Sequence, residues 1–557
     1  MSGERLIYLP LGGAGEIGMN AYVYGYGPPG EERLILVDLG VAFPDMDSTP
    51  GVDLIFPDIQ WLADRSSQLE AIFITHAHED HVGAIAHLHS RLGAPVYART
   101  FTAHIARRKM EDLGGNERAI RTVSAWPETV QAGPFEVGFA PISHSIPESS
   151  GLVIDTPAGR LVHSADFKID LDPVVGEAFD ATMWETIGAS GVRALICDST
   201  NVFSPHEGRS ESSLGPEIER LIGDCKGMFV ATTFASNVAR VKTLAEAGQR
   251  AGRSVCLLGR AMRRMIEASV DTGLLGDFPK TVRAEDALDI PRENLMLIVT
   301  GSQGERRAAS AQLAHGTYQG LEMREGDVFL FSSKTIPGNE RGVIRIINQF
   351  AEKGVDVIDD SSGLYHVSGH ANRPDLSRFH KLVSPQCVVP MHGEHRHLRE
   401  HVKLAQSNGT SGVLAPNGTM IDLSGNRADV AEYVETGRTY LDGSVQIGAL
   451  DGIVRDRIRM ALNGHVTVNV ILDEEDEPMG EPWCEINGLA PEGDSRAPLV
   501  DVLEEDLSQF MGRAKRPTLK DDDALEEGLR RTVRQSAQVE IGKKPEVTVI
   551  ISRLSDG

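Results

Sequence analysis

A short stretch of this sequence concentrates side chains that bind metal ions. His76, His78, Asp80 and His81 form an H-x-H-x-D-H pattern. Imidazole nitrogens and a carboxylate suit a borderline cation such as Zn²⁺ or Mn²⁺, and ligands in a loop can spread far enough to serve two adjacent ions. The alternative is a polar loop that happens to be rich in histidine. Four ligand-type residues in so short a span favour a metal site.

The flanking segments place this motif between a strand and a helix. Residues 69–75 are apolar and β-branched, which predicts a buried strand, and residues 82–89 predict a helix. Loops that follow strands are common places for chemistry in α/β proteins.

Later strands end in single residues of the same chemical types. His144 closes one predicted strand, Asp166 the next, and Asp198 a third. Alone, each would more often be a polar residue with ordinary hydrogen bonds. In this order after the cluster, His144 and Asp166 supply the missing ligands of a two-metal site, in which Asp166 can bridge.

A glycine pattern near the N-terminus imitates a nucleotide-binding loop. Gly13, Gly15 and Gly18 fit G-x-G-x-x-G, and Asp38 falls where a ribose-binding acid is expected. Such a loop must open a helix, but residues 19–26 are aromatic and β-branched and predict a β-meander. We therefore expect no nucleotide here. Asp38 either orients a metal-ligand histidine or caps a turn, and the sequence leaves both open.

Composition narrows the class of protein. The 557 residues suggest two to four domains, and 41% hydrophobic with 24% charged residues is typical of a soluble globular protein. No apolar run reaches membrane-spanning length, and no signal peptide precedes the first predicted strand. Five scattered cysteines without a C-x-x-C pair indicate free thiols in a reducing cytoplasm. The net charge of −25 argues against non-specific adhesion to nucleic acid, but not against a local basic groove.

Residues 206–372 predict a second α/β unit. Its apolar strands alternate with helices, which is typical of a parallel sheet. The loops after these strands carry hydroxyls, glycines and amides, the groups with which proteins hold phosphate. The basic residues near these loops would together form a basic surface, although each alone would be solvated: Arg240, Lys242, Arg260, Arg263, Arg264, Arg306 and Arg307.

The C-terminal third contains one more apolar strand that ends in a ligand-type residue, and then segments of a different kind. His392 closes another apolar strand, and residues 431–460 look like a linker. Residues 466–472 and 547–551 predict strands, and residues 522–540 predict a helix with apolar residues at four-residue spacing. We expect a small α+β domain for assembly or RNA contact.

These motifs resemble a known family. The H-x-H-x-D-H motif followed by His144 and Asp166 is similar to the metallo-β-lactamase fold, and Asp198, His370 and His392 resemble the extra motifs of the β-CASP nucleases. The glycine-rich opening and the C-terminal domain are similar to bacterial ribonucleases of the J family.

The resemblance implies an α/β chain with a metallo-β-lactamase αββα sandwich, an inserted parallel-sheet α/β (β-CASP) domain and a small C-terminal α+β domain. The expected boundaries are 1–205 and 373–430 for the two parts of the sandwich, 206–372 for the insert, 431–460 for the linker and 461–557 for the last domain.

It also implies the site residues. One divalent metal ion lies on His76, His78 and His144, a second on Asp80, His81 and His392, and Asp166 bridges them; zinc is expected, with manganese as the alternative. Asp80, His81, Asp198 and His370 are the expected catalytic residues. The expected substrate-binding residues are Phe234, Ala235, Ser236, Ser302, Ser332, His366, Val367, Ser368, Gly369 and His370.

The activity that the resemblance implies is hydrolysis of RNA. Two cations about 4 Å apart can clamp phosphodiester oxygens and acidify a water, and a pocket for a 5′-monophosphate would give 5′→3′ exonuclease action beside internal cleavage. A β-CASP nuclease acting on DNA and a small-molecule metallo-hydrolase are the alternatives, and the size of the insert counts against the second. A non-catalytic RNA-binding protein with a structural metal would favour cysteine ligands. A homodimer or homotetramer and RNA-decay protein partners are expected, with no membrane.

Overall fold

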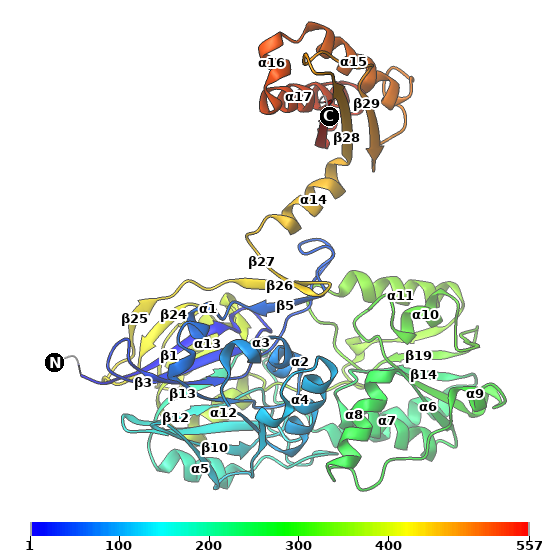
Figure 1. Cartoon of the computed structure of the whole chain (residues 1–557). Coiled ribbons are helices and arrows are strands. Elements are labelled where there is room, and N and C mark those ends of the chain that lie inside the picture. Colours follow the sequence, from blue (N-terminus) through cyan, green and yellow to red (C-terminus); the bar gives the residue numbers. More distant parts are fainter. Residues whose placement is uncertain (1–2, 555–557) are drawn as a thin grey trace. The chain divides into compact units, whose positions relative to one another are not determined.

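Two large β-sheets pack against each other through a shared core (Figure 1). The structure is a computed structural model that describes residues 3–554. The chain divides into two units, one formed by Met1–Phe43 with Leu54–Thr439 and one formed by Pro44–Asp53 with Tyr440–Gly557.

The first sheet has eight strands and the second has seven. The first runs in the order β25 (Asp429–Tyr433), β24 (Thr419–Asp422), β1 (Arg5–Gly12), β3 (Ala21–Gly27), β4 (Arg33–Val37), β6 (Leu69–Phe73), β7 (Val96–Ala98) and β8 (Ile120–Thr122). The second runs in the order β23 (Ser411–Gly412), β21 (Pro385–Met391), β13 (Val192–Asp198), β12 (Gly159–His163), β11 (Ser150–Thr156), β10 (Phe135–Pro141) and β9 (Thr129–Ala132).

Side-chain alternation explains how the sheets pack. Leu6 and Tyr8 of β1 belong to the core shared with the second sheet, while Ile7 and Leu9 are equally buried on the opposite face. The second sheet also has a second buried face, where Trp184 of α5 (Ala181–Ala189) packs with helices α12 (Arg373–Val383) and α13 (His395–Ser407). Helix α4 (Thr100–Asp112) packs against β7 and β8. The layers are therefore αββα, as the sequence predicts.

The insert is a five-stranded parallel sheet with helices on both faces, as expected from its apolar strands. Its strand order is β15 (Ser254–Leu258), β16 (Leu295–Val299), β14 (Phe229–Thr232), β19 (Val328–Phe331) and β20 (Asp356–Ile358). The chain passes from β14 to β15 on one side and later to β19 on the other. The carboxyl ends of β14 and β19 therefore flank a topological switch point, where open α/β sheets bind ligands.

The chain re-enters the sandwich after the insert. Strand β21 pairs in parallel with β13, so that Met391 lies beside Asp198. This pairing returns His392 to the edge of the sheet that already carries Asp166 and Asp198.

The second unit contains a three-stranded sheet in the order β29 (Trp483–Asn487), β28 (His465–Leu472) and β30 (Glu546–Arg553). Helices α15 (Leu499–Arg513) and α17 (Asp522–Ile541) bury their apolar residues against one face. This is a small α+β domain, and α17 matches the helix predicted at 522–540.

Two local expectations have clear outcomes. The glycine pattern at 13–18 opens no helix: β1 and β3 pair antiparallel, and β3 pairs antiparallel with β4, so the β-meander is confirmed. The segment 431–460 is more ordered than a linker, because it contains β26 (Arg438–Asp442), β27 (Val445–Gly448) and α14 (Ile453–Asn463), and β25 extends the first sheet. Within residues 3–554, no helix combines the length and apolarity that crossing a bilayer requires.

Candidate metal centre

The loop after β6 presents the four residues of the H-x-H-x-D-H motif. Helix α2 (Glu79–Val82) begins directly after His78, so Asp80 and His81 fall on its first turn. The loop is fixed to the N-terminal meander, because Asn20 N donates to Asp80 O at 3.0 Å. Gly40 makes this approach possible: a Cβ there would lie 1.6 Å from Asp80 O.

Distant segments complete two ligand groups around this loop. The first contains His76, His78, His144 and Asp166, and the second contains Asp80, His81, Asp166 and His392; in each, the ligand atoms lie within 4.8 Å of one another. Nδ1 of His78 is 3.2 Å from Nε2 of His76 and 3.1 Å from Nε2 of His144. Nε2 of His392 is 3.0 Å from Asp80 Oδ2, across 312 residues of chain.

Asp166 belongs to both groups. Its Oδ2 lies 3.2 Å from His81 Nε2, 3.5 Å from His392 Nε2 and 3.9 Å from His76 Nε2. Its Oδ1 is buried and has no hydrogen-bond partner in the described chain. A buried carboxylate oxygen without a partner is costly, and a bound cation removes that cost. The donor set of imidazoles and carboxylates therefore fits divalent metal ions.

A second layer of hydrogen bonds orients the ligand rings. Asp38 Oδ2 lies 2.7 Å from His81 Nδ1, and the same carboxylate accepts from Thr75 N at 2.8 Å. His144 Nδ1 donates to Gly369 O at 2.6 Å, and His392 Nδ1 is 2.8 Å from Thr200 Oγ1. Such contacts fix the ring orientation and the nitrogen available to a metal. Asp38 thus orients a histidine of the centre, one of the two roles the sequence left open.

The electrostatics differ between the two groups. Burial, reinforced by neighbouring histidines, lowers the pKa values of His76 and His144 well below the usual value, and burial lowers that of His78 to about 4. For His81, burial also opposes the charged form, but Asp166, Asp80 and Asp38 outweigh it and raise its pKa. The first group is therefore ready to bind a cation as neutral imidazoles, whereas binding at the second displaces protons.

Asp198 and His370 form a dyad beside the ligands. His370 Nδ1 donates to Asp198 Oδ2 at 2.8 Å, and the ring stacks 5.6 Å from that of His392. Burial lowers the pKa of His370, but the carboxylate of Asp198, followed by those of Asp166 and Asp80, raises it to about 9. Cations bound to Asp80 and Asp166 would offset part of this effect. The dyad is placed to hold and donate a proton.

The predicted substrate-binding residues lie in two places. Phe234, Ala235 and Ser236 follow β14 and are half-buried. Ser332, after β19, is fully buried. Its hydroxyl donates to Tyr365 O at 2.6 Å, so it joins the loop after β19 to the segment that precedes His366.

Three further predicted substrate-binding residues, Ser302, Ser368 and Gly369, are held by close contacts. Ser302 is also buried. Ser368 Oγ accepts from Asn201 Nδ2 at 2.8 Å. Gly369 lies so close to His144 and Ser145 that its Cβ would be 2.7 Å from Ser145 Oγ.

Sequence reasoning gave no role to two buried polar residues. Asn20 Nδ2 contacts Asp80 O at 2.9 Å and His81 Nε2 at 2.9 Å, and Tyr22 donates to Asn20 Oδ1 at 2.7 Å. The available signal was their place directly after the glycine pattern, where a nucleotide-binding loop would continue as a helix and this sequence predicts a strand instead. The prediction that Arg240 belongs to the basic surface is wrong, because its side chain is fully buried.

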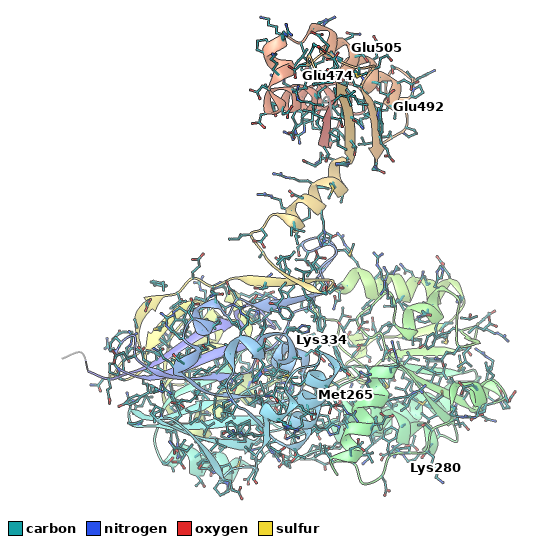
Figure 2. The ribbon with its side chains drawn as sticks, in the orientation of Figure 1. Met265, Lys280, Lys334, Glu474, Glu492 and Glu505 are labelled. Atoms are coloured by element: carbon teal, nitrogen blue, oxygen red, sulfur yellow. The ribbon has the colours of Figure 1, made fainter. Side chains whose placement is uncertain are left out.

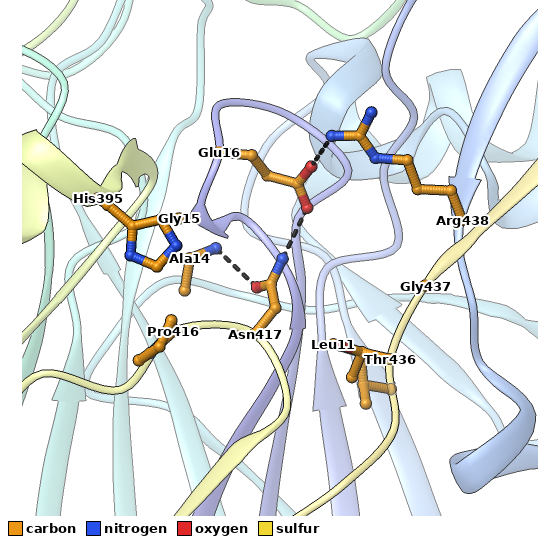
Figure 3. A pocket seen from close by; sticks show the side chains of 10 residues that line it. All are labelled: Leu11, Ala14, Gly15, Glu16, His395, Pro416, Asn417, Thr436, Gly437 and Arg438. Carbon is orange, nitrogen blue, oxygen red and sulfur yellow. Dashed lines mark hydrogen bonds and ion pairs between the residues drawn. The ribbon is translucent and has the colours of Figure 1, made fainter. Parts of the chain in front are cut away.

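A cavity of about 330 Å³ lies behind the loop that carries His392. Asn417 accepts from Ala14 N at 2.9 Å and donates to Glu16, which also pairs with Arg438 at 2.7 Å (Figure 3). None of the predicted metal ligands lines this cavity. These contacts brace the strand pair β2 (Ala14–Gly15) and β22 (Gly393–Glu394) next to His392.

Four families of domains match the chain. They are the metallo-β-lactamase superfamily at residues 14–192, the ribonuclease J β-CASP domain at 226–350, the Zn-dependent metallo-hydrolase RNA specificity domain at 364–416 and the ribonuclease J C-terminal domain at 452–554.

Curated relatives match over nearly the whole length. Ribonuclease J of Sinorhizobium meliloti is 41% identical over 99% of this chain and 98% of its own. Ribonuclease J of Mycolicibacterium smegmatis is 34% identical over 94% and 93%, and that of Thermus thermophilus is 32% identical over 85% and 83%. A crystal structure of a protein of unknown function from Enterococcus faecalis shares the fold, with a TM-score of 0.50 and 16% identity over 75% of this chain and all of that one.

Proposed function

Because the chain belongs to the ribonuclease J family and is therefore a metal-dependent ribonuclease, we propose that it holds two divalent cations and degrades RNA from a 5′-monophosphate end, with internal cleavage as a second mode. One observation carries the two-metal part: Asp166 faces both ligand groups and keeps a buried oxygen without a partner. When bound, two cations polarise the phosphodiester and lower the pKa of a water.

The chain's own residues perform the other steps. His370, held by Asp198 at 2.8 Å, donates a proton to the leaving oxygen, which leaves a 3′-hydroxyl on one product and a 5′-phosphate on the other. Asp38, Thr200 and Asn20 keep the rings of His81 and His392 in place, so that the site needs little rearrangement during the reaction.

The direction of cleavage follows from a second binding place. The loops after β14 and β19 flank the switch point of the insert's sheet, and the segment at 366–370 joins this region to the dyad through His370. A terminal phosphate held there would set the length of chain that reaches the metal centre. RNA without such an end would thread past the pocket and be cut internally.

Two measurements test this proposal. Elemental analysis of protein purified without chelators should find two metal ions per chain, zinc rather than manganese. Product mapping should show faster 5′→3′ degradation of 5′-monophosphorylated RNA than of 5′-triphosphorylated RNA of the same sequence. One ion per chain would contradict the two-metal arrangement, and equal rates would contradict the 5′ pocket. A DNA oligomer of the same sequence tests the choice of RNA.

The assembly and location belong to the same proposal. We expect a homodimer or homotetramer, measurable by light scattering, and RNA-decay proteins as partners, measurable by co-purification. All five cysteines are buried and unpaired, which supports a reducing cytoplasm.

A further inference from the structure

A buried ion pair lies at the carboxyl edge of the insert's sheet. Arg240, on the first turn of α7 (Val238–Arg250), has no exposed surface, and Glu211 is 4% exposed. Nε of Arg240 donates to Glu211 Oε1, and Nη2 lies 3.0 Å from Oε2. A two-point contact of this kind is geometrically defined.

The remaining N–H groups of Arg240 engage three residues expected to bind substrate. Nη1 donates to Ser332 O at 2.7 Å and lies 3.2 Å from His366 Nδ1, and Nη2 lies 3.4 Å from Val367 O. A guanidinium has five N–H donors and no acceptor. With Glu211, these contacts occupy every donor of Arg240, so none is left for a phosphate oxygen. Arg240 therefore organises the pocket without touching its ligand.

The contact with Arg240 determines the form of His366. Since Arg240 can only donate, Nδ1 of His366 accepts, and the ring proton lies on Nε2. Burial, followed by the charges of Arg240, Lys334 and Lys168, lowers the pKa of His366 well below its usual value, so the ring is neutral (Figure 2 labels Lys334). With Nδ1 accepting, Nε2 carries the ring proton and can act as a donor.

A second unused donor stands on the neighbouring loop. Ser333 is 3% exposed, and its hydroxyl has no partner among the described residues. It follows Ser332, whose carbonyl Arg240 holds. A hydroxyl without a partner on this loop and a ring N–H on the next segment are donors that suit an anion with several oxygens.

We infer that the Glu211–Arg240 pair is the positioning element of the 5′-phosphate pocket: it fixes His366 as a neutral Nε2–H donor and holds the 366–367 segment against the loop after β19. This inference rests on the proposed function, because it assumes that the pocket receives a terminal phosphate.

The pair is also tied to the metal centre. Glu211 N donates to Asp170 Oδ2 at 3.0 Å, and Asp170 pairs with Lys168 at 2.7 Å, two residues after Asp166. All three side chains of this link are buried. The separation between the pocket and the bridging carboxylate is thereby fixed, as an enzyme that cuts at a set distance from a 5′ end requires.

The test compares two buried arginines of the same domain. R240K keeps the charge opposite Glu211 but loses the planar fork that reaches His366 and Ser332. R253K is the matched control: Arg253 is 6% exposed and donates to Gly227 O and Cys225 O, each at 2.6 Å, before β14 at the opposite edge of the sheet. Both variants lose a similar set of hydrogen bonds, so the melting temperature of each reports the general structural effect.

The measured quantities are KM and kcat on 5′-monophosphorylated and 5′-hydroxyl RNA of one sequence. In R240K we expect KM for the phosphorylated RNA to rise about 10- to 100-fold, with a smaller change in kcat and with the preference for the phosphorylated end lost. R253K should keep that preference. H366Q, whose amide N–H takes the place of Nε2–H, should retain more of the preference than H366N, whose amide takes the place of Nδ1.

Each outcome decides one claim. If R240K keeps the wild-type preference, or if R253K loses it equally, the positioning role is wrong while the pocket stands. If H366N retains more than H366Q, the assigned tautomer is wrong. If the wild-type enzyme itself shows no preference, the proposed 5′ pocket fails, and this role fails with it.

Discussion

Two clusters of histidines in the first unit both bring ligand-type atoms close together, but they differ in whether hydrogen bonds satisfy those atoms. The metal cluster combines five histidines with Asp80 and Asp166. The core cluster consists of Cys197, His380 and His401, whose ligand-type atoms also lie within 4.8 Å of one another. Only the metal cluster contains carboxylates, and in it Asp166 Oδ1 lacks a hydrogen-bond partner within residues 3–554.

The core cluster is satisfied by its own hydrogen bonds. Asn408 donates to His380 Nδ1 at 3.3 Å, His380 Nε2 donates to His401 Nε2 at 3.0 Å, and His401 Nδ1 donates to Ser199 Oγ at 2.9 Å. The chain ends at Cys197 O, which accepts from Ser199. Every proton has a place in this chain, so a cation would have to displace bonds already formed. Ligand spacing alone therefore does not define a metal site; unpartnered oxygens and negative charge do.

Replacing the bridging residue is the strongest test of this contrast. Asp166→Asn should lower the rate of RNA cleavage by more than about 1,000-fold, because both ligand groups lose a charged oxygen. Bound metal, measured by elemental analysis, should fall with it. Asp155→Asn, on the same sheet and partly exposed, is the control. An Asp166 variant that keeps two ions and full turnover would remove the basis of the comparison.

The dyad should separate proton transfer from metal binding. His370→Ala should reduce kcat by about 100- to 10,000-fold, the usual range for a general acid, while two ions stay bound. Asp198→Asn should act in the same direction, since His370 loses the carboxylate at 2.8 Å. Loss of metal together with activity would instead make His370 a ligand.

Asp38 tests the layer behind the ligands. Asp38→Asn removes the charge 2.7 Å from His81 Nδ1, and we expect a 10- to 100-fold weaker metal affinity in a folded protein. Competition with a chelator measures this change. An unchanged affinity would restrict Asp38 to holding Thr75 and the turn.

The core cluster should respond to acid and not to metal. Burial lowers the pKa of His380 to about 4, so between pH 6.5 and 4 the unfolded chain takes up a proton that the folded chain refuses, and stability falls as pH falls. His380→Gln keeps a donor to His401 but cannot titrate. Urea unfolding should show a loss of stability between pH 7 and 4.5 that is smaller by about 2 kcal/mol, and metal content should equal that of the wild type. An identical pH response would contradict the neutral chain.

Much of the site could be predicted because its signals are local. The H-x-H-x-D-H motif lies between a strand and a helix, and His144, Asp166 and His392 each follow an apolar strand. Parallel strands bring their carboxyl ends to one edge, which favours His144, Asp166 and His392 meeting at one edge of the second sheet, while the motif follows β6 of the first sheet. The β-meander at 13–38 was predictable for the same reason, because aromatic and β-branched residues follow the glycines.

Other features depend on partners that are distant in sequence. Arg240 was grouped with the other basic residues near the loops of the insert, but Glu211, Ser332 and His366 enclose it from three segments. Asp38 had two equally reasonable roles until His81 lay beside it. Nothing local distinguishes His380 in the core from a metal ligand.

By itself the sequence determined which residue types stand at which strand ends, and with them the fold class, the insertion and the chemistry of the centre. The tertiary structure decided which polar groups are left without a partner and which are enclosed. Periodicity and short motifs act within a few residues of the chain. Burial and hydrogen-bond satisfaction are properties of the assembled layers, where Asp80 meets His392 across 312 residues.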